Sequence, residues 1–275
     1  MAITAADVMK LRKATGAGMM DCKNALNEAN GDFDRAIEII REKGKLVASK
    51  RSDREASEGV VLAKVSEDKG FGALVVLNCE TDFVAKNEGF VGLTGKFLET
   101  ALYEKPADLD GLKELKIEGR SIADQVVEQT GIIGEKLELS FYGKVEAPAV
   151  VAYIHPGNKL ATLVGFNQAG VDKQVARDVA MQVAAMNPVA VNQNGVPQHV
   201  VEKELEIARE KFRQEGKPEA MIEKIAQGSL RKFFKENTLL SQAFVKDSKQ
   251  TVKDYLASAD KNLGVTGFVR FALSE

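Results

Sequence analysis

Residues 71–90 read FGALVVLNCETDFVAKNEGF, and their pattern changes from that of a strand to that of a helix. The apolar run from Phe71 to Leu77 is typical of a buried strand. Beyond it, apolar residues recur at helical spacing at Phe90, Leu93, Phe97 and Ala101. Asp82 and Phe83 lie in the stretch between the two patterns. The sequence therefore predicts a strand that delivers an Asp-Phe pair to the edge of a core.

Two interpretations of this Asp-Phe pair stay open at the level of the residues. A carboxylate such as Asp82 in the first turn of a helix is stabilised by the free N–H groups and by the helix dipole, and the ring of Phe83 can seal the edge of the core. Alternatively, the pair projects from the surface and enters a partner protein.

Composition indicates a globular protein without a strong charge bias. The length of 275 residues is enough for two domains or for one domain with appendages, and the hydrophobic fraction of 44% is enough to form their cores. Lys and Arg total 38 against 40 Asp and Glu, and the net charge of -2 does not favour nucleic acid as a partner. We expect neither a secretory leader nor a membrane segment, because no apolar run approaches the roughly 18 residues that a span needs.

Motifs that would indicate an enzyme or a bound cofactor are missing from the sequence. It contains no GxxxxGK[ST], HExxH or GxSxG pattern, and its only histidines are His155 and His199. Cys22 and Cys79 fit no metal-ligand spacing, and free cysteines suit a reducing cytoplasm. We therefore predict no catalytic residues, no metal and no cofactor.

The first 44 residues predict three short helices. Thr4 is placed to cap the first helix and Asp32 the third, which we expect to end near Gly44. In the second helix Met19 shares an apolar stripe with the core positions, whereas Met20 lies off the stripe and is the better candidate for an exposed contact.

Two hairpins in the middle of the chain suggest an internal repeat. The first pairs residues 60–65 with 71–77, and the second pairs 149–154 with 160–166. They align without a gap at an offset of 89 residues, and each leads to a helix. The second copy has no Asp-Phe pair, so the shared fold does not by itself require one.

The last third of the chain predicts a helical hairpin and a closing strand. Two apolar stripes separated by Gly216 and Pro218 indicate antiparallel helices, and the alternation from Val265 to Leu273 indicates a strand that joins a core sheet. The predicted class is α+β. Its parts are a three-helix domain (1–44), a linker (45–59), two core subdomains (60–145 and 146–197), a projecting hairpin (198–236) and a C-terminal module (237–275).

Three stretches closely resemble bacterial elongation factor Ts. They are LRKATGAGMMDCKNAL (11–26), NCETDFVAK (78–86) and VTGFVRF (265–271), and the likeness spans essentially the whole chain in the right order. The resemblance implies an N-terminal domain similar to ubiquitin-associated domains, a core of two related α+β subdomains with antiparallel sheets, and a projecting coiled coil.

The resemblance also implies a function and a set of residues. In that family the first motif contacts the G domain of elongation factor Tu, and the second is tied to dislodging its magnesium. These roles carry over to Leu11, Met19 and Met20, and to Thr81, Asp82, Phe83 and Val84. A core histidine also touches the partner in some members; His155 occupies that place, although Pro156-Gly157 beside it departs from the pattern.

The expectation is therefore a guanine-nucleotide exchange factor of the cytoplasm that binds elongation factor Tu, both GDP-bound and nucleotide-free. The alternative is a non-catalytic adaptor that binds a partner through its N-terminal helices. A homodimer stays open, because the same apolar stripes can pack within one chain or across two.

Overall fold

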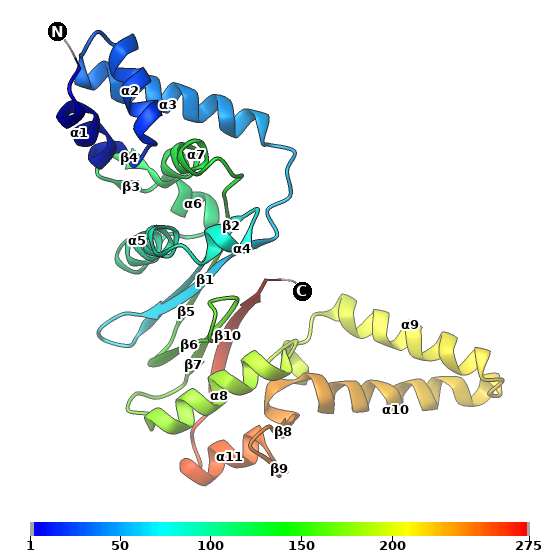
Figure 1. Cartoon of the computed structure of the whole chain (residues 1–275). Helices are drawn as coiled ribbons and strands as arrows, with labels where there is room; N and C mark the ends of the chain where they lie inside the picture. Colours follow the sequence, from blue (N-terminus) through cyan, green and yellow to red (C-terminus); the bar gives the residue numbers. More distant parts are fainter. Residues whose placement is uncertain (1–2, 274–275) are drawn as a thin grey trace. The chain divides into compact units, whose positions relative to one another are not determined.

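A computed structural model describes residues 3–273 of the chain and confirms the α+β class (Figure 1). The described residues form two compact units. The first comprises the residues up to Leu62, the segment Val75–Gly143 and the end of the chain from Ala272, and the second comprises Ala63–Leu74 and Lys144–Phe271. None of the described helices combines the length and the apolar character needed to cross a membrane.

Three helices form the N-terminal bundle, as predicted: α1 (Ala5–Thr15), α2 (Met19–Glu28) and α3 (Phe33–Lys50). Thr4 and Asp7 form a reciprocal capping box at the start of α1, and the Asp32 side chain accepts a hydrogen bond from the Arg35 N–H at the start of α3. The buried core of the bundle includes Val8, Leu11, Cys22, Leu26, Ala36 and Ile39.

Helix α3 does not end near Gly44, and this part of the prediction is wrong. The helix continues to Lys50, so the first residues of the predicted linker are helical. Gly44 lies against α7 (Ile122–Ile133), where a Cβ atom added to Gly131 would overlap the Cα of Gly44. Glycine therefore lets two helix backbones cross closely here, whereas the sequence pattern suggested a helix end.

The first sheet has the strand order β1-β2-β5, formed by β1 (Glu58–Val65), β2 (Phe71–Cys79) and β5 (Glu138–Glu146). The central strand β2 is buried along its whole length, as the apolar run from Phe71 to Leu77 predicted. Between β2 and β5 the chain forms α4 (Asp82–Ala85), α5 (Glu88–Glu104), α6 (Leu109–Glu114), the short strands β3 (Lys116–Ile117) and β4 (Arg120–Ser121), and α7.

The second sheet has the order β10-β7-β6, formed by β6 (Ala149–Ile154), β7 (Leu160–Phe166) and β10 (Val265–Ala272). Strands β6 and β7 are antiparallel, with Ala149 opposite Phe166. Helix α8 (Lys173–Met186) packs on this sheet through a shared core that includes Val164, Phe166, Val179 and Val183. The expectation that the last strand joins a core sheet is confirmed.

The two sheets support the predicted repeat and extend it to a third strand. Asn78 at the end of β2 donates to the Glu58 carbonyl over 3.1 Å and accepts from the Ser140 hydroxyl. At the equivalent position after β7, Asn167 donates to the Asn262 carbonyl over 2.9 Å and accepts from the Gly264 N–H over 2.8 Å. Each asparagine thus ties the central strand to the chain of the third strand.

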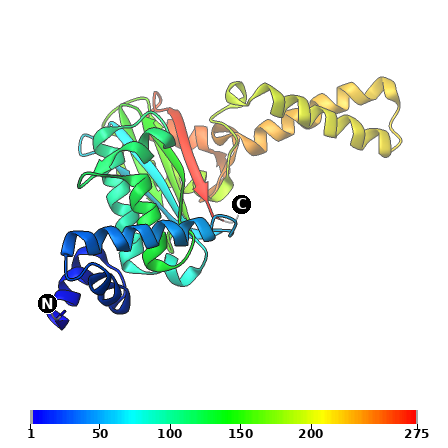
Figure 2. The ribbon, with the colours of Figure 1, turned by 90° about the horizontal axis from the view of Figure 1, so that it is seen from above.

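A helical hairpin and a small module complete the second unit. Helices α9 (Gln198–Gln214) and α10 (Glu219–Asn237) run side by side in opposite directions (Figures 1 and 2) and bury Ala208, Ile222, Ala226 and Leu230. The C-terminal module contains β8 (Ala243–Phe244), β9 (Asp247–Thr251) and α11 (Val252–Ala259), and short 3-10 turns span Gln193–Gly195 and Leu239–Ser241.

Buried Asp178 fastens this module to helix α8. Its carboxylate accepts hydrogen bonds from Lys246 at 2.6 Å, Tyr255 at 3.0 Å and Gln174 at 2.7 Å. Burial alone would raise its pKa, but these three donors together lower the pKa below the ordinary value. The module is therefore held by a charged group that all three partners satisfy.

Candidate partner-binding site

Phe83 projects from the surface on the single-turn helix α4. Its side chain is 82% exposed, and it is among the most exposed large apolar side chains of the described residues. Two residues later Ala85 is buried, and Phe90 in α5 fills the core instead. The interpretation in which Phe83 seals the core edge is therefore excluded, and the interpretation as a projecting group stands.

Thr81 anchors the segment that carries Phe83. Its side-chain oxygen accepts from the Val84 N–H over 3.4 Å and so caps α4. The same hydroxyl donates to Oε1 of Glu135 over 2.7 Å, and the Thr81 backbone N–H donates to Oε2 of Glu135 over 3.0 Å. One carboxylate, 54 residues away in the sequence, thus holds both polar hydrogens of the capping residue.

Glu80 makes the reverse connection next to Thr81. Its Oε1 accepts from the Lys136 N–H over 2.6 Å and from Arg51 Nη1 over 2.8 Å. The Lys136 N–H, and with it the Arg51 guanidinium, lowers the pKa of the Glu80 carboxyl below its ordinary value. The segment before α4 is therefore tied both to the loop after α7 and to the end of α3.

Asp82 lies in the first turn of α4 with Lys86 as its partner. Lys86 Nζ is 2.6 Å from Asp82 Oδ2, and both side chains are exposed to solvent. The hydrogen bond and the charge of Asp82 raise the pKa of Lys86. Both features of the sequence prediction are combined here, since Asp82 is a first-turn carboxylate and is also accessible from outside.

Cys79, at the end of β2, is buried beneath this segment. Its thiol donates to the Thr81 carbonyl over 3.1 Å. Burial, with a further contribution from the charge of Glu135, raises its pKa to about 12, so the group is a neutral hydrogen-bond donor at physiological pH. Among the described residues no group of His, Cys, Asp and Glu side chains is arranged to hold a metal ion.

The N-terminal motif divides between core and surface, which corrects part of the prediction. Leu11 is completely buried in the bundle, so its side chain supports the surface from below and is not itself available to a partner. Met19 was expected to pack in the core but is 39% exposed, because it stands at the first position of α2, beyond the stripe that meets the other helices. Met20 is 63% exposed, as predicted.

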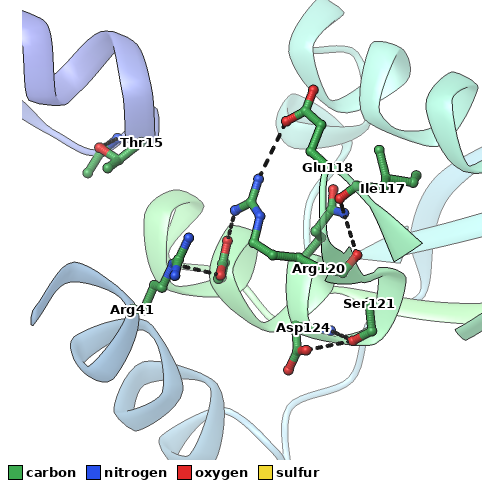
Figure 3. Close-up of polar contacts among 10 residues, drawn as sticks. Thr15, Arg41, Ile117, Glu118, Arg120, Ser121 and Asp124 are labelled. Atoms are coloured by element: carbon green, nitrogen blue, oxygen red, sulfur yellow. Dashed lines mark hydrogen bonds and ion pairs between the residues drawn. The ribbon is translucent and has the colours of Figure 1, made fainter. Parts of the chain in front are cut away.

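The bundle is attached to α7 by an ionic contact as well as by the glycine crossing. Mostly buried Glu128 of α7 lies between Arg41 of α3, at 3.2 Å, and Arg120 of β4. Figure 3 shows Arg41 and Arg120 approaching from opposite sides, with Thr15 of α1 nearby. These residues and the side chains of Glu118 and Ile117 line a polar cavity of about 430 Å³.

His155 lies in the other compact unit, at the turn between β6 and β7. Its side chain is exposed, and Nδ1 is 2.9 Å from the Tyr153 hydroxyl. This contact orients the ring. Thr81, Asp82, Phe83 and Val84 are consecutive in the chain and therefore lie together. Glu80, Glu135 and Arg51 form hydrogen bonds at the base of this segment, and the sequence analysis did not single them out.

Comparison with known proteins identifies the family. The family model for elongation factor Ts matches residues 80–275. Proteins named elongation factor Ts from Porphyromonas gingivalis and Christiangramia forsetii are 55% and 53% identical to the chain, covering 100% and 98% of it and 99% and 98% of their own length. A third, from Bacteroides fragilis, is 44% identical over 99% of each chain. The chain belongs to the elongation factor Ts family, whose members are translation elongation factors.

Proposed function

We propose that this protein is a guanine-nucleotide exchange factor for elongation factor Tu. The observation that carries the proposal, beside family membership, is an almost fully exposed phenylalanine on a segment whose base is anchored. An apolar ring held in water has no role in the stability of its own fold, whereas it stabilises a complex when a partner covers it.

The proposed reaction needs no covalent chemistry. GDP is held in such GTPases by backbone N–H groups around its phosphates and by Mg²⁺. An exchange factor binds the empty GTPase more tightly than the GDP-loaded one. It therefore lowers the affinity of the GTPase for GDP, and GDP lowers the affinity of the GTPase for the exchange factor by the same factor. The partner is accordingly bound in both its GDP-loaded and its nucleotide-free state, through a transient ternary complex.

Each residue of the motif has a separate part in this proposal. Phe83 inserts between elements of the G domain and is buried there. Asp82, carried beside it, competes for the groups and waters that hold the magnesium ion. Thr81 and Val84 set the geometry of the turn that presents them.

The N-terminal bundle supplies a second contact in the same proposal. The exposed side chains of Met19 and Met20 are flexible and apolar, which suits a protein surface that must adapt to a partner. Leu11 acts indirectly through the bundle core in which it is buried, and the exposed ring of His155 offers a third, separate contact. The proposed site of action is the cytoplasm, where translation takes place.

The direct test is stopped-flow release of a fluorescent GDP analogue from elongation factor Tu. The double variant Phe83→Ala, Asp82→Ala, shown by circular dichroism to be folded, is expected to stimulate release at least about tenfold less than the parent, a loss of about 1.4 kcal/mol in transition-state stabilisation. Tyr103→Ala is the matched control, because it removes another exposed ring of the same unit. Full stimulation by the double variant would refute the proposed roles of this pair.

A second measurement separates exchange from simple attachment. The parent protein is expected to co-elute with nucleotide-free elongation factor Tu and to be released by excess GDP with magnesium. Co-elution that is indifferent to nucleotide would support the adaptor alternative instead.

A further inference from the structure

Two glutamates connect the chain around Thr81 with the loop after α7 in a reciprocal way. Glu135 of the loop accepts from the backbone N–H and hydroxyl of Thr81, at 3.0 and 2.7 Å. Glu80, next to Thr81, accepts from the backbone N–H of Lys136, next to Glu135, at 2.6 Å. Each segment thus offers a carboxylate to the main chain of the other.

We propose that Glu135 is a positioning residue that fixes the direction in which Asp82 and Phe83 project from the protein. The inference rests on the proposed function, and it assigns part of that function to a residue outside the Thr81–Val84 motif.

The geometry at Thr81 explains why one side chain can have this effect. The Thr81 hydroxyl donates its single proton in a hydrogen bond to Glu135, so a lone pair of the same oxygen is left to accept from the Val84 N–H over 3.4 Å. The backbone N–H of Thr81 is held by the second oxygen of the same carboxylate, and the Thr81 carbonyl accepts from buried Cys79 at 3.1 Å. All polar groups of Thr81, the residue that caps α4, therefore have hydrogen-bond partners.

Beyond this anchor the turn is held by the buried side chain of Ala85 and by backbone hydrogen bonds from Ala85 to Thr81 and from Lys86 to Asp82. Helix α4 is a single turn of four residues, too short to be stable by itself. Phe83 contributes almost no packing within its own chain because it is largely exposed. The orientation of the ring therefore depends on the cap, and the cap depends on Glu135. A ring with a fixed direction loses less conformational freedom on binding than a mobile one, and this favours the bound state.

Limited proteolysis with chymotrypsin tests the local part of this proposal without any partner. Chymotrypsin cuts after exposed aromatic residues when the chain around them opens, so cleavage after Phe83 reports the order of α4. In Glu135→Ala we expect this cleavage to be about tenfold faster, since both hydrogen bonds to a charged acceptor are lost. Cleavage after exposed Tyr103 at the end of α5 is the internal reference and is expected to be unchanged.

GDP release from elongation factor Tu, measured against factor concentration, tests the functional part. Glu135→Ala is expected to lower the maximal release rate about fivefold to tenfold while the half-saturating concentration changes less than about twofold, because the remaining contacts still bind the partner. A purely structural defect would instead lower the active fraction, which shifts the half-saturating concentration and leaves the maximal rate unchanged.

Two further variants make the comparison specific. Glu138→Ala removes an exposed carboxylate three positions away and is expected to match the parent in both assays. Glu135→Gln keeps an acceptor for the Thr81 N–H but cannot accept from the hydroxyl with its amide nitrogen, so we expect intermediate values. This nearly isosteric variant decides the question if Glu135→Ala does not fold.

The outcomes separate this proposal from the proposed function. Parental cleavage and parental release rates in both Glu135 variants, with release lost in Phe83→Ala, would overturn the positioning role and leave the exchange function standing. Full release by Phe83→Ala would overturn the proposed role of the ring, and with it the functional role of Glu135, whatever the proteolysis shows.

Discussion

Lys86 Nζ lies 2.6 Å from Asp82 Oδ2, one helical turn along the chain, and solvent reaches both side chains. Exposed pairs of this kind contribute at most about 1 kcal/mol and are screened by salt. Separating this pair therefore costs little free energy.

Replacing Lys86 by Met is expected to leave folding unchanged and to raise the maximal rate of GDP release by up to about fivefold, because the pair no longer has to separate. The gain is expected to disappear at about 0.5 M salt, because salt screens the attraction between Lys86 and Asp82 in the parent protein. A large fall in rate would indicate that Lys86 itself contacts the partner.

Truncation of Phe83 and of Phe90 is expected to change the stability of the protein by very different amounts. Phe83→Ala is expected to change the free energy of unfolding by less than about 0.5 kcal/mol, because the ring is already in water. Phe90→Ala removes a buried ring and is expected to cost about 3–5 kcal/mol. Denaturant unfolding checks both values. Comparable losses of unfolding free energy in the two variants would show that the Phe83 ring packs against its own protein.

The crossing of α3 and α7 predicts a contrast between two glycines. Gly131→Ala is expected to destabilise by about 1–3 kcal/mol, since its Cβ would overlap Gly44. Gly95→Ala, in an open part of α5, is expected to stabilise by up to about 1 kcal/mol through helix propensity. The measurement is the melting temperature. Equal effects at the two positions would contradict the close crossing.

Asp178 predicts a pH dependence of stability. Its pKa is lowered in the folded state, so its stabilisation is present above the unfolded value of 3.8 and is lost as the pH falls through the lower folded value. Asp178→Asn is therefore expected to lose about 1–3 kcal/mol at pH 7. The difference from the parent should shrink below pH 3.8. A difference that does not vary with pH would show that the charge of Asp178 is not what fastens the module.

The two cysteines are expected to be unreactive in the folded protein. Cys22 and Cys79 are fully buried, and burial raises the pKa of both thiols, to about 12 for Cys79. At pH 8 about one Cys79 thiol in ten thousand is ionised, so a disulfide reagent should label it only as fast as the protein opens. Cys22→Ala isolates the signal of Cys79. Rapid labelling of the native variant would show that the base of the Thr81 segment opens readily.

Local patterns in the sequence were sufficient for most of the helices and strands. Alternation, helical spacing and turn residues correctly predicted the β-hairpin of 149–154 with 160–166, the helical hairpin and the closing strand. The limits of the predicted domains and the contacts of the proposed site residues with a partner stay predictions.

Residues whose environment depends on distant parts of the chain were the ones that the patterns missed. Gly44 is a residue type that often ends a helix, but here α7 packs against it and α3 continues to Lys50. Met19 was expected in the core from its helical spacing, but it lies at the start of α2 and is exposed, whereas Leu11, which the resemblance implied as a partner contact, is buried in α1. No local signal marks Glu135 as the partner of Thr81, since 54 residues separate them.

The sequence by itself determined the α+β class, the order of the elements and the Asp-Phe pair at a strand-to-helix junction, because spacing and capping are properties of neighbouring residues. Only the tertiary structure decided that Phe83 faces solvent and that Glu80 and Glu135 anchor its base. Exposure and long-range hydrogen bonds depend on which distant segments meet, and packing of the whole unit determines that.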